Sequence, residues 1–257
     1  MVKESNGRWW EFYAVRYAMG SVIGAFIVYL LCLSNQTALG SILFGLENKI
    51  DAEKLILLGI YGLAFCYIAS APILVFHATR LFIFDRRSKK KCRERLLIFA
   101  ISLIFPSWIL CSNYANGMIL GNSGYYALIG FIISWIIVWQ IFLISKAVVN
   151  RKRVFEFYKA LAIKRAQENT DIIDSYKHLR EHGNAFGIVV FEIALGLILY
   201  IYADASISKV GVEEEVYKLE SIVRYITVIL VWIAPASLVW ALATSIERIF
   251  SGFELRK

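Results

Sequence analysis

The sequence predicts an all-α integral membrane protein: a six-span helical bundle with a short cytoplasmic helical segment. Hydrophobic residues make up 59% of the 257 residues, more than one water-soluble domain of this length could hide. They come in blocks and do not alternate with polar residues. A membrane-spanning helix needs about 17–25 mainly apolar residues, and six blocks reach that length. Lys and Arg collect between particular blocks, which gives an independent test of the six spans.

The six predicted spans follow one another along the chain. They are Phe12–Leu33, Leu55–Phe84, Leu96–Ser112, Tyr125–Ser145, Ala185–Ala203 and Ile222–Ser245. The second is longer than a bilayer core requires, so we expect it to tilt or to project toward the loop that follows. The third is short and carries Pro106, and the sixth contains Pro235.

The loops between the spans alternate between many and few Lys and Arg residues. Residues 85–95 hold seven Lys and Arg residues and residues 146–183 hold nine, whereas residues 113–124 hold none. Residues 34–54 hold two, and residues 204–220 hold two among five acidic residues. Because cytoplasmic loops carry an excess of Lys and Arg, both basic loops and both termini are predicted to be cytoplasmic.

This topology divides the chain into three parts. Residues 1–145 form spans one to four with the basic loop 85–95. Residues 146–184 form the cytoplasmic helical segment, and residues 185–257 form spans five and six with a cytoplasmic tail.

A few polar or ionisable side chains lie within the predicted spans, where they usually face a partner helix or an aqueous path. They are Arg16, His77, Arg80, Gln140 and Glu192. At about 1.5 Å per residue, all five fall in the cytoplasmic half of the bilayer, which predicts an intramembrane polar layer. Arg16 is the preferred partner of Glu192, with Arg80 and His77 as alternatives. The arginines could instead extend to the headgroups, and Glu192 could instead line a pore.

Two basic clusters are predicted to bind an anionic ligand or lipid. Their members are Lys89, Lys90, Lys91, Arg151, Lys152 and Arg153. The second cluster lies beside Phe155, Phe157 and Tyr158. Cations beside aromatic rings suit nucleotides and oligonucleotides, and they also suit anionic lipid headgroups. The simpler interpretations are a topological anchor for the first cluster, and for residues 146–184 a helix packed on the membrane surface or on a neighbouring subunit.

Small residues on the first span predict close helix packing. Gly20 and Gly24, with Ser21 and Ala25 beside them, form a face that lets helix backbones approach. The pattern fits contacts between subunits of a homo-oligomer as well as contacts within one chain.

The sequence supports neither an enzyme nor a cofactor or metal site. It contains no Walker loop, Gly-rich dinucleotide turn or GxSxG motif. The four cysteines have no disulfide or metal spacing and are interpreted as small hydrophobic residues. Asp174, His178 and His182 would share a helix face that could hold zinc, but a solvated face is the simpler interpretation.

The amino-terminal stretch GRWWEFYAVRYAMGSVIGAFIVYLL resembles the start of multi-spanning membrane effectors of bacterial anti-phage systems such as Hailong and Kiwa. The features that carry the resemblance are the Trp9–Trp10 pair, Arg16 within YAVRY and the glycine face. The resemblance implies an oligomeric channel or membrane-perturbing protein, controlled by a nucleotide-derived ligand or a cytoplasmic protein. It implies no particular site residues.

The leading functional hypothesis is therefore an oligomeric ion channel or membrane-perturbing effector in a bacterial inner membrane, gated from the cytoplasm, in anti-phage defence. One alternative is a small transporter or lipid-handling membrane protein. Another is a membrane sensor or anchor whose segment 146–184 recruits a soluble partner.

Overall fold

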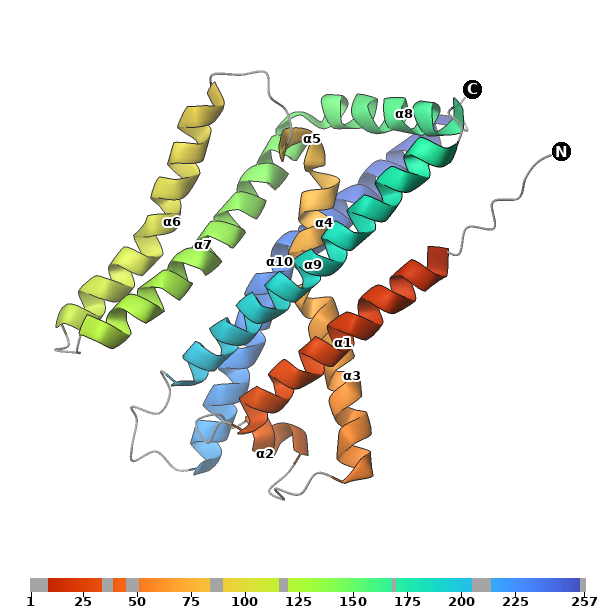
Figure 1. The fold of residues 1–257 in the computed structure, drawn as a ribbon. Helices are drawn as coiled ribbons and strands as arrows, with labels where there is room; N and C mark the ends of the chain where they lie inside the picture. Colours follow the sequence, from red (N-terminus) through yellow and green to blue (C-terminus); the bar gives the residue numbers. More distant parts are fainter. Residues whose placement is uncertain are drawn as a thin grey trace. The chain divides into compact units, whose positions relative to one another are not determined.

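The structure, a computed structural model, is helical throughout the part of the chain that it describes (Figure 1). This part comprises residues 9–33, 39–44, 51–83, 90–115, 120–167, 170–204 and 214–254. These residues form no strand. The prediction of an all-α fold is confirmed for them.

The helices follow in chain order with short connections. They are α1 (Trp9–Leu33), α2 (Leu39–Phe44), α3 (Ala52–Ala69), α4 (Ala71–Ala78), α5 (Arg80–Ile83), α6 (Lys90–Ala115), α7 (Leu120–Val149), α8 (Arg151–Gln167), α9 (Thr170–Asp204) and α10 (Glu214–Glu254).

Four helical stretches are long and apolar enough to cross a membrane. They are Ala52–Ala78, Ala127–Val149, Gly183–Ile201 and Ile222–Thr244, and they overlap predicted spans two, four, five and six. The first predicted span contains a shorter apolar helix, Tyr17–Leu33. The third predicted span lies within α6, which is not among the four. The structure thus supports a membrane location, and the count of six spans stays a prediction.

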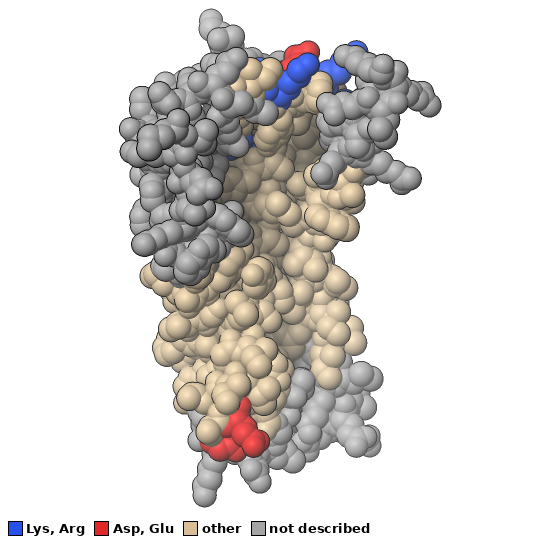
Figure 2. Space-filling model, turned by 90° about the vertical axis from the view of Figure 1, so that its right-hand side faces the viewer, with Lys and Arg blue, Asp and Glu red and all other residues tan. Residues whose placement is uncertain are grey.

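Large apolar side chains cover much of the outer surface of these helices. Val22, Ile56 and Trp240 are each about two-thirds exposed or more, at 71%, 66% and 67%. On the face seen in Figure 2, the described surface between the helix ends carries no Lys, Arg, Asp or Glu. Such a surface would be a liability in water but is well matched to lipid.

The chain forms two compact units. The first combines residues 1–70 with 169–224, and the second combines residues 71–168 with 225–257. The predicted division at residues 145 and 184 concerns position in the membrane and stays a prediction.

In the first unit, α1 packs against α3, and α9 packs against both. The contact is a close approach of backbones. A Cβ placed on Gly24 would lie 2.5 Å from the Gly62 carbonyl oxygen. A Cβ on Gly62 would lie 2.5 Å from the Ala25 nitrogen and would overlap the Ser21 carbonyl oxygen. At the contact of α1 with α9, Ile27 Cγ2 lies 2.6 Å from the position that a Cβ on Gly196 of α9 would take. Only hydrogen atoms fit at these three glycines.

The predicted second span is interrupted twice. At Ser70, between α3 and α4, the N–H donates to the Cys66 carbonyl at 3.0 Å, and Oγ donates to the Tyr67 carbonyl at 2.9 Å. Pro72 follows, and it has no N–H to continue the helical hydrogen bonds. Thr79 separates α4 from α5.

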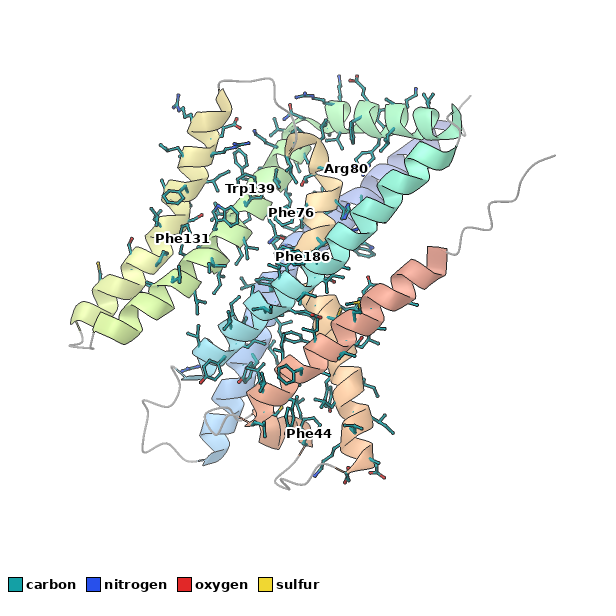
Figure 3. The ribbon with its side chains drawn as sticks, viewed as in Figure 1. Phe44, Phe76, Arg80, Phe131, Trp139 and Phe186 are labelled. Atoms are coloured by element: carbon teal, nitrogen blue, oxygen red, sulfur yellow. The ribbon has the colours of Figure 1, made fainter. Side chains whose placement is uncertain are left out.

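In the second unit, α6 and α7 form a hairpin (Figure 1). Lys146 forms an ion pair with Glu94 across it, and its Nζ lies 4.7 Å from the Phe142 ring centroid. Phe99 and Phe131 meet edge to face further along, with ring centroids 5.5 Å apart; Figure 3 labels Phe131. Val75 of α4, Ile144 of α7, and Ala236 and Val239 of α10 form a buried apolar cluster.

The glycine contacts generate a matched pair of variants on one helix. Gly62→Ala is expected to lower the free energy of unfolding by about 1–3 kcal/mol, because its methyl group must push α1 away from α3. A Cβ on Gly59, also on α3, meets nothing within 4 Å. Gly59→Ala should therefore leave stability unchanged or raise it by up to about 1 kcal/mol through helix propensity. Thermal unfolding in detergent, followed by circular dichroism, measures both, and equal effects would contradict the close approach.

Candidate functional site

A buried carboxyl group lies where the three main helices of the first unit meet. Glu192 of α9 is 0% exposed. Its Oε1 and Ile188 Cγ2 each lie 3.3 Å from the position that a Cβ on Gly20 of α1 would take, and Cys66 Sγ of α3 is closer still. We call these four residues, Gly20, Cys66, Ile188 and Glu192, the Glu192 junction.

Helical spacing explains why these residues meet. Residues four apart lie one above the other on the same helix face. Ile188 and Glu192 are so spaced on α9. Gly20 lies four residues before Gly24 on α1, and Cys66 lies four after Gly62 on α3. The Gly24–Gly62 contact thus sets the helix separation one turn away from the junction. Because Gly20 has no side chain, the thiol and the carboxyl occupy the space beside α1.

The surroundings of the Glu192 carboxyl are poor in hydrogen-bond donors. Neither carboxyl oxygen meets hydrogen-bond geometry with a described group, although the Cys66 thiol lies beside them. A thiol is a weak donor, so it offsets little of the desolvation of a carboxylate. A charged side chain without a partner in the bilayer costs about 3 kcal/mol or more. The carboxyl is therefore neutral here, or a cation outside the described side chains compensates its charge.

The preferred partner, Arg16, belongs to α1 four residues before Gly20. Its side chain lies outside the part of the structure that is described, so the Arg16–Glu192 pair stays a prediction. One helical turn separates Arg16 from Gly20, about 6 Å along the axis, which an arginine side chain can span.

The other members of the predicted polar layer belong to the second unit. His77 lies in the last turn of α4, Arg80 is the first residue of α5, and Gln140 lies on α7. Gln140 is fully buried, and its Nε2 donates to the Ile136 carbonyl of its own helix at 3.2 Å. Its Oε1 has no hydrogen-bond partner among the described groups. A layer that joins all five residues stays a prediction.

Arg80, which Figure 3 labels, contacts the aromatic residues of α8. Its guanidinium carbon lies 5.6 Å from the Phe157 ring centroid and 5.5 Å from that of Tyr158. The Tyr158 hydroxyl donates to the carbonyls of Ala78 at 2.9 Å and His77 at 3.2 Å. From the sequence, Arg80 was predicted in a polar layer and the two aromatic residues in a ligand site, whereas their contact with one another was not predicted.

The basic clusters are described in part. Arg151, Lys152 and Arg153 are exposed at the start of α8. Lys90 and Lys91 begin α6, but their side chains and the whole of Lys89 lie outside the described structure, as do the side chains of Asp174, His178 and His182. Within the described ranges, no group of three His, Cys, Asp or Glu residues could hold a metal ion.

The roles of Gly62 and Cys66 in helix packing were not predicted either. A signal for them exists in the stretch GLAFCYIAS, where Gly62, Cys66 and Ser70 recur every four residues. This is the same spacing of small residues that identified Gly20 and Gly24 on the first span.

The predicted Arg16–Glu192 pair can be tested by stability. Glu192→Gln is expected to lower the free energy of unfolding by about 3 kcal/mol, because it leaves a buried cation without its partner. The double variant Arg16→Gln, Glu192→Gln should recover most of that loss. Thermal unfolding of the purified protein measures both. If Glu192→Gln alone stabilises the protein, the carboxyl is not paired with Arg16.

Comparison of the chain with protein-family models, with curated proteins and with solved structures gave no match.

Proposed function

We propose that this protein is a homo-oligomeric ion channel of a bacterial inner membrane that is gated from the cytoplasm. The observation that carries the proposal is the Glu192 carboxyl, which three apolar helices enclose without a hydrogen bond from any described group. An ionisable group at such a place in a membrane protein is costly and usually belongs to an ion path or its control.

The Glu192 junction would be the closed state of the gate. Moving α9 away from α1 and α3 would admit water to the carboxyl and so remove its desolvation cost. An acidic side chain in a wetted pore attracts cations, so the open channel would prefer them. The junction is held by contacts at Gly20 and by the small thiol of Cys66. Helices that meet through such small groups can pack in two discrete arrangements, one closed and one open.

The chain also links the junction to the proposed cytoplasmic side. Cys66 accepts the Ser70 N–H at the point where α3 gives way to α4. At the other end of α4, the carbonyls of His77 and Ala78 bind Tyr158 of α8. A ligand or protein that moves α8 would therefore act on the helix that follows Cys66.

The proposed setting is anti-phage defence, which rests on the resemblance of residues 7–31 to membrane effectors of Hailong and Kiwa systems. Phage plating on a bacterial host with and without the gene and its neighbours tests this setting, and unchanged plating of every phage would remove it.

The topology is tested by labelling from outside intact cells. Ser88→Cys, Ala160→Cys and Ser206→Cys place a thiol in each of three loops. With Cys32, Cys92 and Cys111 replaced by alanine, only Ser206→Cys should react with a membrane-impermeant thiol reagent, because residues 85–95 and 146–183 hold sixteen of the 28 Lys and Arg residues. Reaction at residues 88 and 160 without reaction at 206 would place both basic loops outside.

The channel is tested in planar bilayers with the purified full chain. Gly20→Ala should raise the open probability, because its methyl group overlaps Cys66 Sγ. Gly59→Ala serves as the control and should behave as the wild type. The double variant Arg16→Gln, Glu192→Gln should conduct with a weaker preference for cations, seen as a smaller reversal potential in a salt gradient.

The same experiment separates the channel from its alternatives. If no variant conducts but vesicles with the protein scramble lipid or take up solute, the protein handles lipid or transports a substrate. If neither activity appears, a sensor or anchor is the better explanation.

A further inference from the structure

We propose that α8 is an interfacial helix that binds the headgroups of anionic lipids. The proposal stands independently of channel activity, because it rests on the position and the exposed surface of one helix.

The position of α8 follows from where α7 leaves the membrane. The apolar stretch of α7 ends at Val149, and α8 begins two residues later at Arg151. Val148 and Val149 are 49% and 81% exposed. Figure 1 shows α8 turning steeply away from α7 at this point. The first turn of α8 therefore lies at the depth where hydrocarbon gives way to headgroups.

A set of contacts holds α8 in this orientation. The Tyr158 hydroxyl donates to the carbonyls of His77 and Ala78, and the Arg80 guanidinium lies over the rings of Phe157 and Tyr158. Val154 and Leu161 are half-buried on the same side of the helix. The opposite side of α8 carries side chains that are exposed in the described structure.

This exposed side combines cations with apolar side chains. Lys152, Phe155, Lys159 and Ile163 are spaced by three, four and four residues, so they form one stripe. Both lysines are exposed, Phe155 is 38% exposed and Ile163 is 47% exposed. Over its whole length α8 carries six Lys and Arg residues and one acidic residue, Glu156.

This combination selects lipid over a soluble anion. A nucleotide or free phosphate would satisfy Lys152 and Lys159 but would leave Phe155 and Ile163 in water. An anionic lipid satisfies both kinds of side chain: its phosphate meets the ammonium groups, and the boundary of its acyl chains receives the phenyl and butyl groups.

The test uses the full chain in nanodiscs with a fluorophore on Ala160→Cys, which is exposed on α8. Cys32, Cys92 and Cys111 are replaced by alanine to keep the label at one site. Spin-labelled phosphatidylglycerol or spin-labelled phosphatidylcholine, each diluted in phosphatidylcholine, serves as the quencher. We expect stronger quenching by phosphatidylglycerol, and a difference that decreases with added salt.

Variants of the stripe separate lipid from other partners. Lys152→Gln and Lys159→Gln should each lower the preference for phosphatidylglycerol by about fivefold, since one basic residue near an anionic surface contributes about 1 kcal/mol. Phe155→Ser with Ile163→Ser should weaken quenching by both lipids. Glu156→Gln, which removes the one acidic side chain, should raise the preference and serves as the control of opposite sign.

Two results would overturn the proposal. The first is equal quenching by the two lipids. The second is a preference that the lysine variants lower while Phe155→Ser with Ile163→Ser leaves all quenching unchanged. The second result would indicate a charge-only surface, suited to a soluble polyanion or an acidic protein.

Discussion

The close approach of α1 and α3 at Gly24 and Gly62 is the constraint on which the first unit depends. Lipid is as apolar as the side chains that it contacts, so helices in a membrane gain little from simple burial of apolar surface. Their association depends on dispersion contacts, which weaken within a fraction of an ångström. At Gly24, a Cβ would lie 2.5 Å from a backbone oxygen. Methyl groups at both Gly24 and Gly62 would therefore separate the two helices. They would also remove the contacts of Gly20 one turn away.

This packing buries the Glu192 carboxyl at a position where its own helix offers it no hydrogen-bond donor. Four polar residues are fully or almost fully buried in the described structure: Thr79, Ser102, Gln140 and Glu192. The first three each donate to the carbonyl four residues earlier in the chain, at 2.7, 2.7 and 3.2 Å. An ionised carboxylate only accepts hydrogen bonds, and the N–H groups of its helix are already used. Glu192 must therefore obtain a proton, a cation or water from elsewhere, and this need makes it the strongest functional candidate.

The helices were predictable from the sequence because apolar blocks of membrane length have few other structures. Glu192 was predictable as well, since a carboxyl stands out in such a block. The neighbours of Glu192 were not. In a soluble helix, the apolar stripe shows which face is buried, but a membrane helix is apolar on the lipid side too. The contact of Cys66 with Gly20 depends on which faces meet, and only the recurrence of small residues every four positions hints at it. The helix break at Ser70 was not predictable for a similar reason. Whether Pro72 interrupts a helix depends on whether nearby groups satisfy the backbone groups that lose their hydrogen bonds.

The break at Thr79 shows how such an interruption can become a binding site within the fold. In an unbroken helix, the Phe82 N–H would donate to the Ala78 carbonyl. Here it donates to the Thr79 carbonyl at 2.9 Å, so the Ala78 carbonyl needs another donor, as carbonyls at the end of any helix do. The Tyr158 hydroxyl supplies it. The cation of Arg80 beside the same helix end is also favourable, because the carbonyl end of a helix is electronegative. A continuous helix through residue 79 would have offered Tyr158 no acceptor. The orientation of α8, and with it the exposed stripe of lysine and apolar side chains, thus follows from the break between α4 and α5.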